Sequence, residues 1–123
     1  AVIVPKDRAC HLTPTVRKIS SGGSELIPFI IVTNIARAIN KIKNHGVKIV
    51  GGDHLAEQAY NDIDLKGSVA FIIGSEGNGL RRLTSKNCDN LVSIFMPGRI
   101  ESLNASVSTG ILLFEYVRQN FLK

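Results

Sequence analysis

The stretch Val69-Ala-Phe-Ile-Ile-Gly-Ser-Glu-Gly-Asn-Gly-Leu80 decides the fold, because a run of apolar residues leads at once into three glycines and then into a helical pattern. Residues 69–73 are the most apolar run in the chain, so we expect a central strand that is buried on both faces. The glycines allow a sharp turn over residues 74–79, and a helix is predicted from about Leu80. A strand, a loop and a helix in this order are the unit from which parallel α/β sheets are built.

The same unit recurs on both sides of this stretch. Further strands are predicted over residues 2–4, 29–32, 47–50 and 91–95, and helices over residues 14–21, 35–45, 55–60 and 102–121. Gly22-Gly23 would close the first helix, Thr33 or Asn34 would cap the second, and Gly46 sits at its C′ position. We therefore expect one α/β domain over residues 1–123, with a mostly parallel sheet and helices on both faces.

Composition excludes several classes of protein. Hydrophobic residues make up 44% and charged residues 20% of the chain, which argues against a disordered or fibrous protein. The net charge of +5 favours a polyanionic partner, although only weakly, and the scarcity of aromatic residues argues against recognition by base stacking. Cys10 and Cys88 are far apart and the histidines have no metal-ligand spacing, so we expect reduced thiols, a cytoplasmic protein and no metal. No apolar run is long enough to cross a membrane, so we expect no membrane association.

The glycine loop has the spacing G-x-x-G-x-G between Gly74 and Gly79. It is neither the dinucleotide fingerprint nor a P-loop, which disfavours a phosphate cradle. Glu76, in the middle of the loop, would repel a phosphate but suits a hydroxyl donor or a cation. A glycine-rich turn without any ligand is the alternative.

A second segment carries polar residues at the start of the last helix. The strand over residues 91–95 breaks at Pro97-Gly98, and Ser102, Asn104 and Ser106 follow. One of these residues would cap the helix, but three are more than one cap needs. In a parallel sheet the loops after the strands meet at one edge, so the surplus polar groups would lie beside the glycine loop and could orient a substrate there.

Two pairs of basic residues could flank that edge. Arg81-Arg82 follows the glycine loop, and Arg17-Lys18 lies in the first predicted helix. Such pairs most often lie on a solvated face, but two pairs near one edge favour contacts with phosphates.

Together the two segments resemble the SpoU (TrmH-type) branch of the SPOUT RNA methyltransferases. Residues 71–83 are similar to that family's second motif, and residues 94–108, with Ser102-Leu-Asn-Ala-Ser-Val107, are similar to its third. Lys18, Pro28 and Thr33 also sit where the bacterial large-subunit rRNA guanosine 2′-O-methyltransferases have comparable residues. The resemblance covers essentially the whole chain.

The resemblance implies an α/β fold with a C-terminal trefoil knot, in which S-adenosylmethionine is bound in a bent form, largely by backbone groups. It implies methylation of a ribose 2′-hydroxyl in RNA, with rRNA as the expected substrate, by a homodimer formed through the last helix. The residues carried over are Gly74, Ile94, Leu103, Thr33, Gly51 and Met96 for the cofactor, and Glu76, Asn104 and Ser106 for catalysis. From the two basic pairs, Lys18, Arg81 and Arg82 are the residues that we expect to contact the RNA.

The chain also departs from the family pattern. The family's first motif contains an Asn and an Arg, and it would precede Ala1. We therefore expect a fragment that lacks the first strand and helix, any N-terminal RNA-binding extension and the main catalytic Arg, and that is inactive by itself if this Arg is required. Phe95-Met96-Pro97 also replaces the usual Ile-Pro-Met. The alternatives are a non-catalytic RNA-binding module of the same fold, a methyltransferase acting on tRNA, and a flavodoxin-like nucleotide-binding domain.

Overall fold

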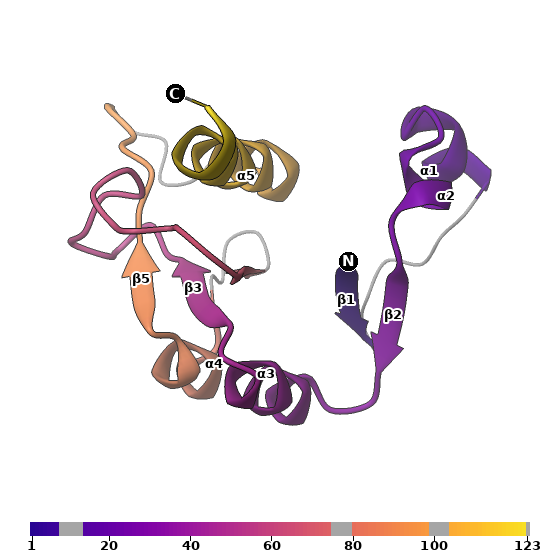
Figure 1. Cartoon of the computed structure of the whole chain (residues 1–123), viewed down its shortest axis with the longest axis horizontal. Coiled ribbons are helices and arrows are strands. Elements are labelled where there is room, and N and C mark those ends of the chain that lie inside the picture. Colours follow the sequence, from indigo (N-terminus) through magenta and orange to yellow (C-terminus); the bar gives the residue numbers. More distant parts are fainter. Residues whose placement is uncertain (8–13, 75–79, 99–103, 123) are drawn as a thin grey trace. The chain divides into compact units, whose positions relative to one another are not determined.

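The computed structural model describes residues 1–7, 14–74, 80–98 and 104–122 (Figure 1). Its elements are β1 (Val2–Pro5), α1 (Pro14–Ile19), α2 (Gly23–Leu26), β2 (Phe29–Val32), α3 (Ile35–Asn44), β3 (Lys48–Gly52), β4 (Val69–Ile73), α4 (Arg82–Asn87), β5 (Asn90–Val92) and α5 (Ala105–Phe121). All strand pairs among the described residues are parallel, which confirms the α/β class. The chain forms two compact units, Ala1–Ala38 and Ile39–Lys123, and each is described by itself.

The first unit is built on two parallel strands. In this sheet Val2 of β1 lies opposite Phe29 of β2. The described part of the connection between the strands holds two short helices where one was expected, because Ser21 and Gly22 have the left-handed backbone angles φ 52° and 87°. Such residues do not continue a helix, so α1 ends before them, and Gly22 is the N-cap of the next helix, α2.

Both ends of α3 follow their sequence signals. The backbone N–H of Arg37 donates to Oδ1 of Asn34 at 3.1 Å, so Asn34 rather than Thr33 caps the helix. Gly46, just past the last turn, has φ 82° and provides the expected left-handed C-terminal stop. On the apolar side of the helix Ile39 is buried.

The second unit contains a three-stranded sheet in the order β4-β3-β5. β3 is therefore central in this sheet, and the expectation that residues 69–73 form its central strand is wrong. All five residues of β4 are half-buried, and α5 packs along this strand. An apolar run indicates that both faces of a strand are covered. The faces of a strand at the side of a sheet can be covered just as those of a central strand are.

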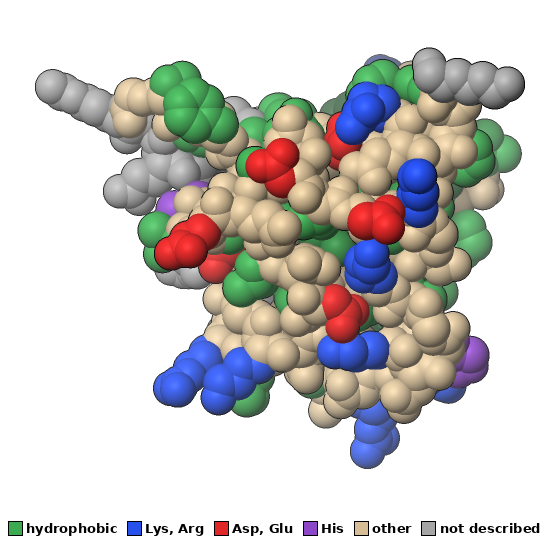
Figure 2. All heavy atoms as spheres, turned by 60° about the vertical axis from the view of Figure 1, so that its left-hand side comes forward, with side chains coloured by type: hydrophobic (Ala, Val, Ile, Leu, Met, Phe, Trp, Pro, Cys, Tyr) green, Lys and Arg blue, Asp and Glu red, His purple; other side chains and the backbone are tan. Residues whose placement is uncertain are grey.

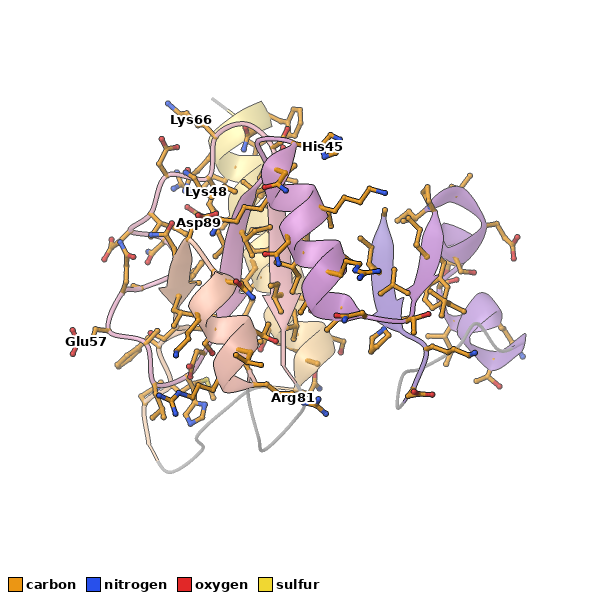
Figure 3. All side chains as sticks on the ribbon, turned by 90° about the horizontal axis from the view of Figure 1, so that it is seen from below. His45, Lys48, Glu57, Lys66, Arg81 and Asp89 are labelled. Atoms are coloured by element: carbon orange, nitrogen blue, oxygen red, sulfur yellow. The ribbon has the colours of Figure 1, made fainter. Side chains whose placement is uncertain are left out.

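Two adjacent glycines show that helices cover both faces of this sheet. A Cβ atom at Gly51 would lie 2.6 Å from Leu80 Cδ1 and 2.8 Å from Cys88 Sγ, on the side of α4. A Cβ atom at Gly52 would lie 3.6 Å from Leu112 Cδ1 of α5. Neighbouring residues of a strand face opposite sides, so α4 and α5 lie on opposite faces, as Figures 1 and 3 also show.

The main core lies between the sheet and α5. It is formed by the buried side chains of Val50, Ile63, Leu65, Val92 and Leu112. Two of these residues come from the segment over residues 53–68 that joins β3 to β4, which gives this segment its own anchor in the core.

Residues 55–60 in this connection do not form the helix that was expected. The backbone N–H of Tyr60 donates to Ser93 O at 2.9 Å, and that of Ser93 donates to Gln58 O at 2.9 Å. The segment therefore pairs with the chain just beyond β5 instead of bonding to itself. β5 is shorter than predicted, because only an isolated bridge between Ala59 and Ser93 continues it past Val92.

Side chains near the end of α5 hold the connection in place, and we call them the α5 clamp: Tyr116, Gln119 and Asn120. Gln119 accepts from Leu65 N at 2.8 Å and donates to Ile63 O at 3.0 Å. Asn120 donates to Leu65 O at 2.9 Å and accepts from Gly67 N at 3.0 Å, while the Tyr116 hydroxyl donates to Gly67 O at 2.8 Å.

The clamp sets the direction of α5. Gly67 lies just before β4, so the end of the helix lies near the amino ends of the strands, whereas Leu112 lies against Gly52 at the carboxyl end of β3. The helix therefore runs antiparallel to the strands, and its first turn lies beyond their carboxyl ends. The helix starts at Ala105, later than predicted, because Asn104 is extended and acts as the N-cap.

Candidate functional site

The carboxyl ends of three strands meet at one edge of the sheet in the second unit. Gly52 of β3 lies opposite Ile73 of β4 and Val92 of β5. Gly74 and Ser93, which follow β4 and β5, therefore lie side by side with the end of β3 between them. Two strand spacings separate them, which is about 10 Å. The structure thus brings Gly74 and Ile94 to the same edge, where ligands of parallel α/β sheets bind.

Backbone groups along this edge lack partners. Gly74, Ile94 and Met96 are half-buried, and their N–H and C=O groups make no hydrogen bond among the described residues. Backbone polar groups that are shielded from water need a partner, and a ligand can supply one. A ligand that binds here would therefore meet backbone donors and acceptors from two separate strands.

The start of α5 adds polar side chains on the same side. Leu112 lies against Gly52, and Asn104 is eight residues earlier, which places it about 12 Å beyond this point along the helix axis. Asn104 Oδ1 accepts from Val107 N at 2.8 Å and from Ser106 Oγ at 2.9 Å. Both side chains are exposed, and the Asn104 amide nitrogen has no partner among the described residues.

Gly51 has a packing role that the sequence did not indicate. A Cβ atom at this position would lie under 3 Å from three side-chain atoms, on Leu80, Cys88 and Leu91. The glycine therefore lets α4 and β5 approach the centre of the sheet. Its predicted contact with a cofactor stays a prediction.

Arg81 and Arg82 are exposed at the start of α4. They directly follow Leu80, whose side chain packs near Gly51 and so ties this end of α4 to the carboxyl part of β3. Figure 3 shows Arg81 at the opposite end of the unit from Lys48 and Lys66. On the face drawn in Figure 2, basic side chains mostly alternate with acidic ones, apart from a basic group at the lower left.

The remaining predicted site residues belong to the first unit or lie outside the described residues. Lys18 and Thr33 are exposed residues of the first unit, where Thr33 follows the carboxyl end of β2. Glu76 and Leu103 lie outside the described residues. Their predicted roles stay predictions.

One carboxylate at the edge was not expected from the sequence. Asp53 follows Gly52 directly, and its N–H donates to Val92 O at 2.9 Å. Its Oδ1 accepts from Leu55 N at 2.9 Å, and only 23% of the side chain is exposed. The signal in the sequence was the acidic residue placed at once after the strand that ends in Gly51-Gly52.

The carboxylates with the clearest pKa shifts lie away from this edge. The pKa of Asp89 is lowered mainly because it accepts from Ile49 N at 2.7 Å, with a further contribution from Lys43. The pKa of Glu115 is lowered mainly by its hydrogen bonds from Arg118. Asp89 thus joins α3 and β3, whereas these hydrogen bonds of Glu115 lie within α5.

The described residues contain neither a metal site nor a membrane-spanning helix. No group of three or more His, Cys, Asp or Glu residues there has the arrangement of a metal site. None of the helices in that part of the chain has both the length and the apolar character needed to cross a bilayer.

Comparison with known proteins assigns the chain to a family. A model of the SpoU rRNA Methylase family matches residues 1–114. The 23S rRNA (guanosine-2′-O-)-methyltransferase RlmB of Pseudomonas putida is 50% identical over 123 residues, which are 100% of this chain and 50% of the relative. The protein of the same name from Coxiella burnetii is 52% identical over 119 residues, which are 97% of this chain and 48% of the relative. The chain spans about half the length of the curated relatives it matches.

Solved structures agree with this assignment. An RNA 2′-O ribose methyltransferase superposes with a TM-score of 0.84 at 31% identity, over 97% of this chain and 46% of that one. The SpoU methyltransferase AviRb from Streptomyces viridochromogenes, solved in complex with AdoMet, superposes with a TM-score of 0.85 at 28% identity, over 95% of this chain and 48% of that one. The chain belongs to the SpoU rRNA methylase family.

Proposed function

We propose that this chain is the catalytic region of an enzyme that transfers a methyl group from S-adenosylmethionine to a ribose 2′-hydroxyl in rRNA. The observation that carries the proposal is the identity of about one half, over the whole chain, to proteins named as 23S rRNA guanosine 2′-O-methyltransferases. The carboxyl edge of the sheet in the second unit supports it, because polar side chains gather there beside backbone groups that have no partner among the described residues.

The residues at this edge fit the cofactor. The half-buried backbone groups of Gly74, Ile94 and Met96 have no partner among the described residues and would receive its polar atoms. Thr33, Gly51 and Leu103 complete the proposed cofactor set. When bound, S-adenosylmethionine supplies a methyl group that is already activated on a sulfonium, so the protein has to position the acceptor and assist loss of its proton.

Asn104 and Ser106 would position the ribose hydroxyl. The Asn104 amide nitrogen makes no hydrogen bond to the described residues and could donate to the substrate, whereas its oxygen is occupied as the helix cap. Ser106 Oγ donates its own proton to that oxygen, and its lone pairs remain available to accept a hydrogen bond from the substrate hydroxyl. Glu76 would orient the substrate, and Lys18, Arg81 and Arg82 would contact RNA phosphates.

The proposal includes a homodimer formed through α5. It also includes a C-terminal trefoil knot. Several large apolar side chains of α5 are exposed, including Leu113, Phe114 and Phe121, while Leu112 and Glu115 are buried on another side of the helix. A helix with apolar residues on more than one side suits a core on one face and a second subunit on the other. Action on ribosomal RNA implies that the protein works in the cytoplasm.

The test is methyl transfer by the full-length protein. We expect calorimetry to detect binding of S-adenosylmethionine, and transfer of radiolabelled methyl groups to a 23S rRNA transcript but not to unmodified tRNA. Transfer to tRNA alone would mean that tRNA, and not rRNA, is the substrate. RNA binding without any affinity for S-adenosylmethionine would mean that the protein is a non-catalytic RNA-binding module and not an enzyme.

The basic pair offers a separate test of the RNA contact. Replacing both Arg81 and Arg82 by Ala should weaken RNA binding and make its dependence on salt less steep, because fewer counterions are released from the phosphates. Lys66→Ala is the control, since Lys66 lies at the other end of the unit (Figure 3). An unchanged salt slope in the double variant would place the pair away from the RNA.

A further inference from the structure

Asp53 occupies the middle of the carboxyl edge. It directly follows the central strand β3, with Gly74 at the end of β4 on one side and Ser93 at the end of β5 on the other. The hydrogen bond from its N–H to Val92 O extends the ladder between β3 and β5 by one residue. This bond fixes the backbone of Asp53 at the end of β3.

The side chain of Asp53 is only half satisfied. Oδ1 accepts from Leu55 N at 2.9 Å and lies 3.9 Å from His54 Nδ1. Oδ2 has no hydrogen-bond partner among the described residues, although the side chain is 23% exposed and thus largely covered. A largely covered carboxylate with one open acceptor is placed to receive a ligand here, because the nearby backbone groups of Gly74 and Ile94 also have no partner among the described residues.

We propose that the Asp53 carboxylate binds the methyl donor by accepting a hydrogen bond from one of its polar donor groups. This inference rests on the proposed function and adds to it a residue outside the two motifs that carry the family resemblance. S-adenosylmethionine offers two kinds of donor to a carboxylate, the ribose hydroxyls and the ammonium of its methionyl part. An acidic side chain near a strand end that binds a ribose hydroxyl is a recurrent solution in parallel α/β sheets.

The decisive variant is Asp53→Asn in the full-length protein. Asn keeps the oxygen that accepts from Leu55 N, so the local turn is retained, but it replaces the second oxygen by an amide that cannot accept. We expect the dissociation constant for S-adenosylmethionine, measured by calorimetry, to rise about tenfold or more, because a hydrogen bond to a charged group is lost. Asp53→Ser, whose hydroxyl can also support the turn, should give the same result.

The chain contains a matched control in Asp64. Its Oδ1 accepts from Lys66 N at 2.9 Å, which is the same local bond that Asp53 makes with Leu55. Its carbonyl oxygen, however, accepts from Lys48 Nζ, and Lys48 is the first residue of β3, so Asp64 lies toward the opposite edge of the sheet. Asp64→Asn should change the affinity for S-adenosylmethionine by less than about twofold.

A second ligand distinguishes between the ribose hydroxyls and the ammonium as the donor. 5′-Methylthioadenosine keeps the ribose but lacks the ammonium. Weaker binding of both ligands by the Asp53 variants supports a bond to the ribose, and weaker binding of S-adenosylmethionine alone supports a bond to the ammonium. Unchanged affinity in Asp53→Asn and Asp53→Ser, with normal thermal unfolding, overturns this inference and leaves the proposed function intact. Failure of the wild-type protein to bind S-adenosylmethionine overturns both.

Discussion

The two edges of the three-stranded sheet differ in how completely their polar groups are paired. At the amino edge, Asp89 accepts from Ile49 N and forms an ion pair with Lys43 at 3.3 Å, and the α5 clamp bonds to the backbone of residues 63–67. At the carboxyl edge, the backbone groups of Gly74, Ile94 and Met96 have no partner among the described residues, and Asp53 and Asn104 each keep one free polar atom.

This difference separates groups that hold the fold from groups that can bind. A polar group with all its bonds made inside the protein has nothing to offer a ligand, and removing it lowers stability. A polar group with an open bond at a covered edge contributes less to stability and is available to a ligand. Substitutions at the amino edge should therefore lower the free energy of unfolding, and substitutions at the carboxyl edge should lower affinity or turnover.

Gln119→Ala should have the largest effect on stability. The substitution leaves Leu65 N and Ile63 O without their partners in a segment whose side chains are buried, so we expect a loss of about 2–4 kcal/mol in the free energy of unfolding. Urea denaturation followed by circular dichroism measures it. Gln58→Ala is the control, since this side chain is exposed and makes only one long bond, of 3.5 Å. Equal stabilities of the two variants would show that the clamp does not hold the connection.

The two adjacent glycines of β3 provide the next comparison. At Gly51 a Cβ atom would lie 2.6 Å from Leu80 Cδ1 and 2.8 Å from Leu91 Cδ2, whereas at Gly52 its nearest neighbour would be 3.6 Å away. Gly51→Ala should therefore cost about 1–3 kcal/mol of stability through overpacking, and Gly52→Ala should stay within about 0.5 kcal/mol of the wild type. Thermal unfolding of both variants measures the difference. A reversed order would mean that the side chains around Gly51 move aside freely.

Local patterns predicted much of the fold. Asn34 and Gly46 delimit α3 through contacts with residues within a few positions in the chain, and the apolar runs of β2, β3 and β4 were found for the same reason. The prediction of a helix over residues 55–60 was wrong because Tyr60 and Gln58 pair with Ser93, which is more than thirty residues away in the chain. A tertiary pairing of this kind overrides local helix propensity and leaves no periodic signal.

The candidate site divides in the same way. Asn104 as a helix cap follows from a local rule, and Gly74 and Ile94 meet because parallel strands bring their carboxyl ends together. The open oxygen of Asp53 could not be foreseen as a candidate site, because the covering of its side chain depends on the surrounding fold. The α5 clamp was also missed, since its bonds join residues 49 to 56 positions apart.

Asn104→Asp tests whether the start of α5 acts on substrate beyond its role as a cap. Asp keeps the oxygen that accepts from Val107 N but lacks the amide donor, so we expect turnover on RNA to fall about tenfold while stability stays within about 0.5 kcal/mol. Ser106→Ala should also lower turnover with little change in fold. Asn104→Ala, which removes the cap as well, should lose about 1 kcal/mol of stability in addition. Wild-type turnover in Asn104→Asp and Ser106→Ala would refute the positioning role.

The smallest expected effect is the pH dependence of stability that Asp89 contributes at the amino edge. The folded pKa of Asp89 lies below its ordinary value of about 4, mainly because of the bond from Ile49 N and less because of Lys43. Its ionised form therefore stabilises the fold above pH 4, and this contribution is lost as the pH falls through the folded pKa. Because the side chain is 36% exposed, solvent screening limits the gain to a few tenths of a kcal/mol, on the order of that of a surface pair.

Asp89→Asn should accordingly reduce the loss of stability between pH 5 and pH 3, and Lys43→Met should reduce it less. The first substitution removes the titrating group, whereas the second leaves the stronger bond from Ile49 N in place. High salt should weaken only the part that depends on Lys43, since a short hydrogen bond to the backbone is not screened like an ion pair. An equal effect of both substitutions would mean that the ion pair, rather than the backbone of β3, sets the acid sensitivity of this edge.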